Sequence, residues 1–109
     1  MRFQADAPLM KGMRRMSELV QGLQHGRQGH LGPDQVRQLA TGVNQAAAAM
    51  FAECQLPPEP DAALHGLLAR LMAGAGALDA DPANLAPLDD MDAAVRDYTR
   101  LFDDPGFPD

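Results

Sequence analysis

Apolar residues recur along the chain at alternating steps of three and four positions, in four separate segments. This spacing places the apolar side chains on one face of an α-helix, where they can be buried together. The four apolar stripes are Leu9, Met13, Met16, Val20 and Leu23; Val36, Ala40, Val43, Ala47, Met50 and Cys54; Leu64, Leu68, Leu71, Ala75 and Leu78; and Met91, Val95, Tyr98 and Phe102. The pattern therefore predicts four amphipathic helices.

Helix start and stop signals give the expected bounds of these helices as about 7–25, 33–55, 61–78 and 88–103. Asp6 and Asp61 stand where each can cap the start of a helix, the first and the third. The prolines of segment 57–60 cannot continue a helical hydrogen-bond ladder, so they predict a break. The segment 104–109 is not expected to be helical, and we expect Phe107 to fold back onto the end of the bundle.

The connections between the predicted helices are short. Short connections make successive helices antiparallel neighbours, which is the up-down-up-down arrangement of a four-helix bundle. A chain of 109 residues has the size of one compact domain. We therefore expect an all-α fold with a single helical-bundle domain spanning residues 1–109.

The composition agrees with helices and narrows the classes of function. Apolar residues make up 46% of the chain, with seven methionines, five aromatic residues and no tryptophan, and this mix favours helix over sheet. The formal charge is −6, and the nine basic residues form no stripe that could follow a phosphate backbone. No apolar run reaches the roughly 20 residues that a membrane-spanning helix needs. Nucleic-acid binding and a membrane span are therefore not expected.

The expected topology brings reactive side chains to one end of the bundle. The start of the first helix, the end of the second and the start of the third share that end, where Met10, Met13, Cys54 and His65 would lie. A thioether, a thiol and an imidazole are ligands that copper, above all Cu(I), and haem iron accept. The sequence thus predicts a metal site formed by these four residues, with copper as the candidate metal.

A second hypothesis needs no cofactor. Methionine on a helical stripe usually fills the core, a lone buried cysteine usually acts as a small apolar residue, and His65 can be satisfied by Asp61 one turn earlier. On this view the chain is a structural or protein-interaction bundle, with Cys54 in the core or at the contact of a homodimer. The sequence contains no Glu-x-x-His motif, no glycine-rich phosphate loop and no Gly-x-Ser-x-Gly motif. We therefore do not expect an enzyme.

Three segments, 6–13, 54–65 and 98–107, carry a resemblance to known proteins. They read Asp-Ala-Pro-Leu-Met-Lys-Gly-Met, Cys-Gln-Leu-Pro-Pro-Glu-Pro-Asp-Ala-Ala-Leu-His and Tyr-Thr-Arg-Leu-Phe-Asp-Asp-Pro-Gly-Phe. The chain resembles small exported bacterial proteins with a soluble-cytochrome-b-like four-helix bundle. The resemblance implies a periplasmic address and a helical bundle, and it implies no reaction.

The cytochrome likeness also supplies a third hypothesis, the binding of a b-type haem. It would make Met10 or Met13 an axial haem ligand. In such cytochromes the opposing histidine comes from the last helix, and the predicted last helix of this chain contains none. His65 of the third helix would have to take that place.

Overall fold

The computed structural model describes residues 1–107, and within them the chain folds into four α-helices. These are α1 (Ala7–Gln24), α2 (Pro33–Glu53), α3 (Pro58–Ala80) and α4 (Pro87–Leu101). A single turn of 3-10 helix, η1 (His25–Gln28), follows α1, and the two-residue strands β1 (Phe3–Gln4) and β2 (Phe102–Asp103) flank the helices. The predicted all-α class is confirmed.

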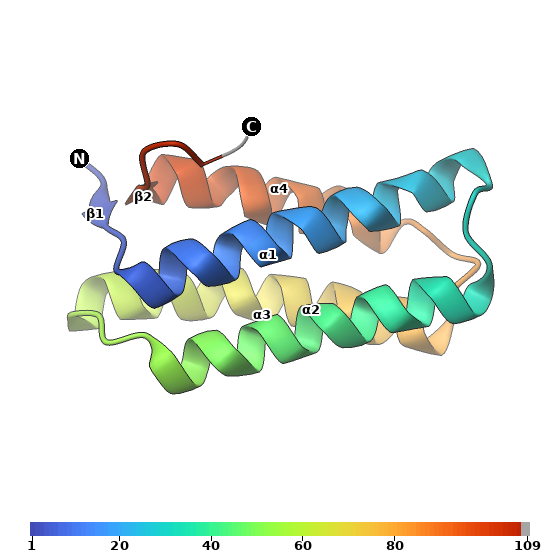
Figure 1. The fold of residues 1–109 in the computed structure, drawn as a ribbon, viewed down its shortest axis with the longest axis horizontal. Helices are drawn as coiled ribbons and strands as arrows, with labels where there is room; N and C mark the ends of the chain where they lie inside the picture. The colour runs from blue at the N-terminus through green and yellow to red at the C-terminus, as the bar shows by residue number, and fades with distance from the viewer. Residues whose placement is uncertain (108–109) are drawn as a thin grey trace.

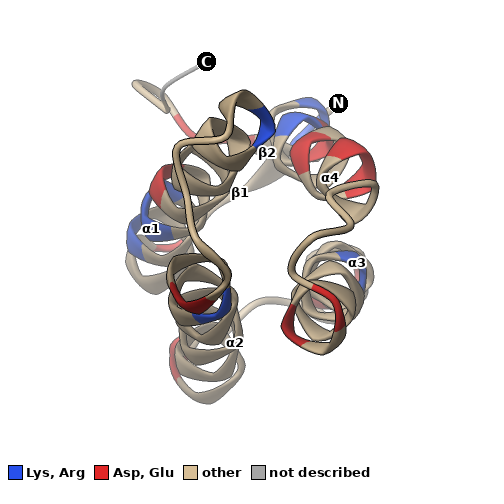
Figure 2. Ribbon diagram, turned by 90° about the vertical axis from the view of Figure 1, so that its right-hand side faces the viewer, with Lys and Arg blue, Asp and Glu red and all other residues tan. Residues whose placement is uncertain are grey.

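The helices pack side by side around one core. In Figure 1, α1 and α3 run from left to right, and α2 and α4 return from right to left. α1 and α3 each contact both α2 and α4, so the four helices form a closed ring, and the end view of Figure 2 shows them at four corners. The elongated molecule measures 39 × 24 × 18 Å. Among residues 1–107 no helix is both long and apolar enough to cross a membrane.

The four predicted apolar stripes form the core. All of their residues are buried except Cys54, which is half-buried where α2 ends. Among the glycines that let helices approach closely, two lie against methionines: Gly12 of α1 against Met50 of α2, and Gly74 of α3 against Met91 of α4. A Cβ atom at either glycine would overlap the neighbouring methionine side chain.

Several helix ends differ from the sequence prediction by one to three residues, including the end of α2 at Glu53, expected at 55, and the end of α3 at Ala80, expected at 78. α3 begins at Pro58, three residues before the expected start at 61, because Pro58 occupies the first turn, where a backbone N–H has no helical acceptor. Asp61 therefore lies inside the first turns of α3 and is not its cap. α4 ends at Leu101, two residues early, because Phe102 is extended and pairs with β1.

The segments before α1 and after α4 contact each other. β1 and β2 pair in parallel, with Phe3 opposite Phe102. The Arg14 guanidinium makes a two-point contact with the buried Asp104 carboxylate at 2.9 and 3.1 Å, and the Tyr98 hydroxyl donates to the same carboxylate at 2.7 Å. We call Arg14, Tyr98 and Asp104 the terminal clasp.

Phe107 packs over this clasp. Its ring centroid lies 5.0 Å from that of Tyr98, and the Arg14 guanidinium lies over its face. The expected return of Phe107 to the bundle is confirmed. Residues 108–109, which belong to the same predicted tail, lie outside the described residues.

Candidate functional site

Asp6 joins the start of α1 to the end of α2. It is the N-cap of α1, as the sequence predicts, because its Oδ1 accepts a hydrogen bond from the Leu9 N–H at 2.9 Å. Its Oδ2 accepts a second hydrogen bond from the Gln55 N–H, the residue after Cys54, at 3.0 Å. Two backbone donors from different elements therefore fix this carboxylate beside Cys54.

Cys54 carries a half-buried free thiol at the end of α2. Burial raises the pKa of the Cys54 thiol to about 11, and the Asp6 carboxylate adds to the shift by its charge and as a hydrogen-bond acceptor. The charges of Asp61 and Glu53 act in the same direction. The thiol is therefore protonated at neutral pH, inside an acidic environment.

His65 lies in the second turn of α3 and contacts residues of both α2 and α3. Its Nε2 lies 3.5 Å from Asp61 Oδ2, one helical turn earlier, as the sequence indicated. Its ring meets Phe51 of α2 edge-on, with the ring centroids 4.9 Å apart. The side chains of His65 and Asp61 are 54% and 43% exposed, so both can reorient without disturbing the core.

The two predicted methionine ligands, one helical turn apart on α1, differ in burial. Met13 is fully buried among the core side chains, as core-filling methionine is expected to be. Met10 is half-buried, and its backbone carbonyl accepts a hydrogen bond from Arg14. No hydrogen bond of the described residues involves either methionine sulfur.

The predicted ligands thus fall into two groups. Cys54 and His65 lie where α2 ends and α3 begins: the His65 ring contacts Phe51, three residues before Cys54, and the charge of Asp61, which contacts His65, adds to the raised pKa of the thiol. Met10 and Met13 show no such link. As the side chains stand in residues 1–107, no group of three or more His, Cys, Asp and Glu residues is arranged to hold a metal ion.

Sequence reasoning found Asp61 but missed the second role of Asp6. An N-cap aspartate needs only one of its two oxygens for the cap, so the other oxygen is available to a further donor. Which donor it meets depends on the packing of α1 against the end of α2, and the local sequence does not encode that.

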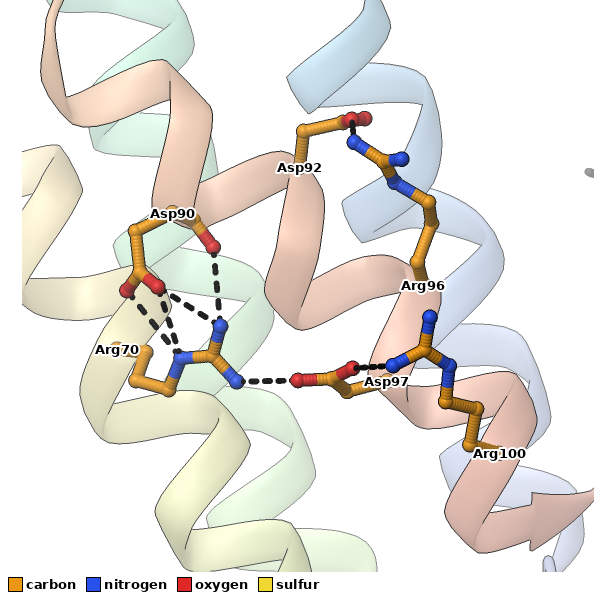
Figure 3. A network of polar contacts seen from close by, with 6 residues as sticks. All are labelled: Arg70, Asp90, Asp92, Arg96, Asp97 and Arg100. Atoms are coloured by element: carbon orange, nitrogen blue, oxygen red, sulfur yellow. Dashed lines mark hydrogen bonds and ion pairs between the residues drawn. The ribbon is translucent and has the colours of Figure 1, made fainter.

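A second polar cluster lies between α3 and α4. Figure 3 shows the Arg70 guanidinium held between Asp90 and Asp97, with Arg100 on the other side of Asp97. The contact with Arg70 lowers the pKa of Asp90. These side chains pair with one another on the surface, so the cluster ties two helices together.

A shallow apolar hollow of about 620 Å³ lies beside the candidate site. β1 and the proline-rich start of α3 line it, through Phe3, Gln4 and Pro57–Pro60. Phe51, which touches His65, is 44% exposed. This end of the bundle therefore offers apolar surface next to the thiol and the imidazole.

Comparison of the chain with protein-family models, curated proteins and solved structures finds no match. The structure is that of a compact four-helix protein, and no family assignment follows from these comparisons.

Proposed function

We propose that this protein binds a soft metal ion, with copper as the candidate, at the end of the bundle where α2 ends and α3 begins. Cys54 and His65 are the proposed primary ligands. The observation that carries the proposal is the edge-on contact of the His65 ring with Phe51, three residues before Cys54, which brings the start of α3 against the end of α2. Sulfur and imidazole nitrogen are donors that copper accepts.

Binding would need local movement but no unfolding. The exposed side chains of Asp61 and His65 can turn toward the thiol, and the incoming ion would displace the thiol proton, because thiolate is the form that binds metals. Met10, half-buried at the start of α1, is the better placed of the two methionines to add a thioether. Met13 would have to leave the core to do so.

Titration of the reduced protein with Cu(I) against a competing chelator tests this function. We expect Cys54→Ala and His65→Ala each to weaken binding by at least about tenfold. His30→Ala is the matched control, because His30 is exposed and belongs to the connection between η1 and α2, which Figure 1 shows at the other end of the bundle from the α2–α3 connection. Unchanged affinity in both site variants would reject the site.

The proposal extends to the wider setting of the protein. We place the chain among exported, periplasmic helical bundles with up-down-up-down topology, on the strength of the residue resemblance in segments 6–13, 54–65 and 98–107. Fractionation of cells that express the full natural gene tests the address, and recovery in the cytoplasm alone would refute it.

The apolar hollow beside Phe3 and the exposed Phe51 favour a second candidate, a cofactor-free bundle that binds a protein partner or a second copy of itself at this end. Sedimentation equilibrium of wild type and Phe51→Ser tests the homodimer. Concentration-dependent association that Phe51→Ser abolishes would support it, and a monomer at all concentrations would exclude the second copy.

Haem binding is the third candidate, and it has less support. α4 contains no histidine, so His65 of α3 would have to oppose Met10 or Met13. Haemin titration followed by visible spectroscopy tests it, and an unshifted Soret band would eliminate this candidate.

A further inference from the structure

We propose that the groove between α1 and α4 binds a small amphipathic carboxylate, such as a medium-chain fatty acid, with its apolar chain along the groove and its carboxylate at Arg96 and Arg100. The groove is formed by other residues than the proposed metal ligands, so this inference stands whether or not the protein binds metal. It follows from the shape of the groove, from one buried hydroxyl and from the charges on the rim.

The groove lies on the most open side of the helical ring. α1 and α4 contact each other less extensively than the other neighbouring pairs of helices, and a hollow of about 460 Å³ remains between them. Sites for small molecules commonly have this size. The lining positions of α4 extend from Asp92 to Arg100, about 12 Å along the helix axis, so the groove suits an elongated molecule.

The floor of the groove is apolar. Val20 of α1 and Val95 of α4 line it, and both belong to the hydrophobic core. Phe107 lines the groove as well, and its ring is held in place by the contact with Tyr98. A hydrocarbon chain lying here would be removed from water on several sides, which supplies affinity without directional bonds.

Ser17 places a polar group in this apolar surface. Ser17 and Asp104 are the buried polar side chains of residues 1–107, and Ser17 is 4% exposed. The terminal clasp satisfies Asp104, whereas the Ser17 hydroxyl accepts one long hydrogen bond, from Gln21 at 3.5 Å, and donates none within the described part of the chain. A buried hydroxyl is stabilised by hydrogen bonding. Because Ser17 lines the groove, its proton is available to an acceptor on a ligand.

Two guanidinium groups stand on the rim of the groove. Figure 3 shows Arg96 turned toward Asp92 and Arg100 turned toward Asp97, each through one guanidinium nitrogen. A guanidinium carries five N–H donors, so both arginines retain donors for an anion. Their side chains are 68% and 78% exposed, so both can turn toward a ligand without disturbing the core.

The balance of charge indicates a monoanion. The charged residues that line the groove are Asp92, Arg96 and Arg100, which sum to one positive charge in a chain of formal charge −6. One carboxylate neutralises this charge, whereas a phosphate dianion would leave negative charge beside Asp92. Arginine is also suited to carboxylate, because the planar guanidinium can donate two parallel hydrogen bonds to it.

Titration with decanoate, followed by amide chemical shifts in NMR spectra, tests the site. We expect saturable binding with the largest shift changes at Ser17, Val20 and Val95. Decanol, which lacks the charge, and acetate, which lacks the chain, should each bind at least about tenfold more weakly.

A pair of double variants tests the role of the charges. Arg96→Gln with Arg100→Gln should weaken decanoate binding by at least about tenfold. Arg15→Gln with Arg27→Gln is the matched control, because these two arginines also make exposed ion pairs, the charge change is equal, and neither lines the groove. Ser17→Ala should weaken binding by about threefold through loss of one neutral donor. Circular dichroism checks that every variant is folded.

Several results would overturn the inference. They are the absence of saturable decanoate binding, equal binding of decanoate and decanol, and equal affinity of the two double variants for decanoate. Shift changes centred on Phe3 and Gln4, which line the other apolar hollow, would also overturn it, because they would place the ligand at a different surface.

Discussion

At the residue scale, Asp104 is a buried carboxylate that depends on specific neighbours for its charge and its hydrogen bonds. Its side chain is 1% exposed, and a buried carboxylate is tolerated only where its charge is paired and hydrogen-bonded. Arg14 supplies the charge, and Tyr98 donates a hydrogen bond from the core side. Burial and this bond to Asp104 together raise the pKa of Tyr98, so the hydroxyl keeps its proton across the neutral range.

Tyr98→Phe tests how much the hydroxyl contributes. The substitution keeps the ring and its aromatic neighbours but removes a donor to a buried charge, so we expect the free energy of unfolding to fall by about 1.5–3 kcal/mol. Urea denaturation followed by circular dichroism measures the change. Arg27→Ala removes an exposed ion pair with Asp89 and should cost less than about 1 kcal/mol. If Tyr98→Phe and Arg27→Ala lowered the free energy of unfolding equally, the Tyr98–Asp104 hydrogen bond would contribute no more to stability than an exposed ion pair.

The Cys54 thiol gives a prediction about pH. Because its pKa is raised to about 11, alkylation by iodoacetamide near pH 8 should be slower than for an ordinary thiol and should accelerate up to about pH 11. Asp6→Asn should shift the profile to lower pH, since one nearby negative charge is lost. If the alkylation rate instead rose with a midpoint at the ordinary thiol pKa of 9.0, the thiol would not experience the burial and the acidic neighbours described above.

The raised pKa of the Cys54 thiol also makes the free energy of unfolding depend on pH. A folded-state pKa above the unfolded value favours the folded state at low pH, so this contribution is complete below about pH 9 and disappears as pH rises toward about 11. Cys54→Ala should therefore flatten the dependence of stability on pH in that window. Urea denaturation at a series of alkaline pH values measures the difference.

At the element scale, the contacts between helices depend on small residues at set positions. Gly74 of α3 accommodates Met91 of α4, whereas Gly76, two residues later on the same helix, faces open space. By helix propensity alone, Gly74 and Gly76 lower the stability of α3 equally. Only the packing of α4 against α3 shows that a side chain would fit at Gly76 and not at Gly74.

These glycines form a matched pair for mutation. Gly76→Ala should raise the free energy of unfolding by about 0.5–1 kcal/mol, because alanine restricts the unfolded chain and favours helix. Gly74→Ala makes the same gain but overlaps Met91, and overpacking of this kind costs about 1–3 kcal/mol, so the net effect should be a loss. Urea denaturation of both variants decides the matter, and a gain in Gly74→Ala would show that Met91 adjusts freely.

How far the sequence predicts each element depends on how local its determinants are. The apolar stripes predict all four helices and their buried faces because helical spacing is a local property. The start of α3 was misplaced because prolines that break a helix interior are compatible with its first turn. The end of α4 was misplaced because Phe102 pairs with Phe3, a residue from the opposite end of the chain.

At the scale of the whole molecule, the candidate site is also predictable from the sequence only in part, since some of its features follow from chain topology and others from side-chain packing. Chain direction places Cys54 and the start of α3 at one end, which the topology predicts. The sequence could not show that Met13 is held in the core or that the second oxygen of Asp6 reaches Gln55, because both depend on how neighbouring helices meet. The sequence therefore predicts which residues share this end of the bundle, whereas the packing decides which of their side chains are buried.

The segments before α1 and after α4 also hold the fold together by contacts with each other. β1 lies before α1 and β2 after α4, and the terminal clasp joins α1 to the segment that follows β2. α1 and α4 are the first and last helices, so no connection joins them directly. The clasp takes the place of such a connection and limits how far these two helices can separate.

The substitution Phe107→Ala tests whether Phe107 covers the terminal clasp, and the fluorescence of Tyr98 reports the result. The chain contains a single tyrosine and no tryptophan, so its ultraviolet fluorescence comes from Tyr98 alone. Loss of the Phe107 ring removes an aromatic contact worth about 0.5–1.5 kcal/mol beyond its buried area and uncovers one side of Tyr98 and Arg14. Acrylamide should then quench the fluorescence more strongly, while the helical circular dichroism stays unchanged. Quenching equal to wild type would mean that Phe107 does not cover the clasp, and α1 and α4 would then be held together by their core contacts, the Arg14–Asp104 pair and the β1–β2 pair.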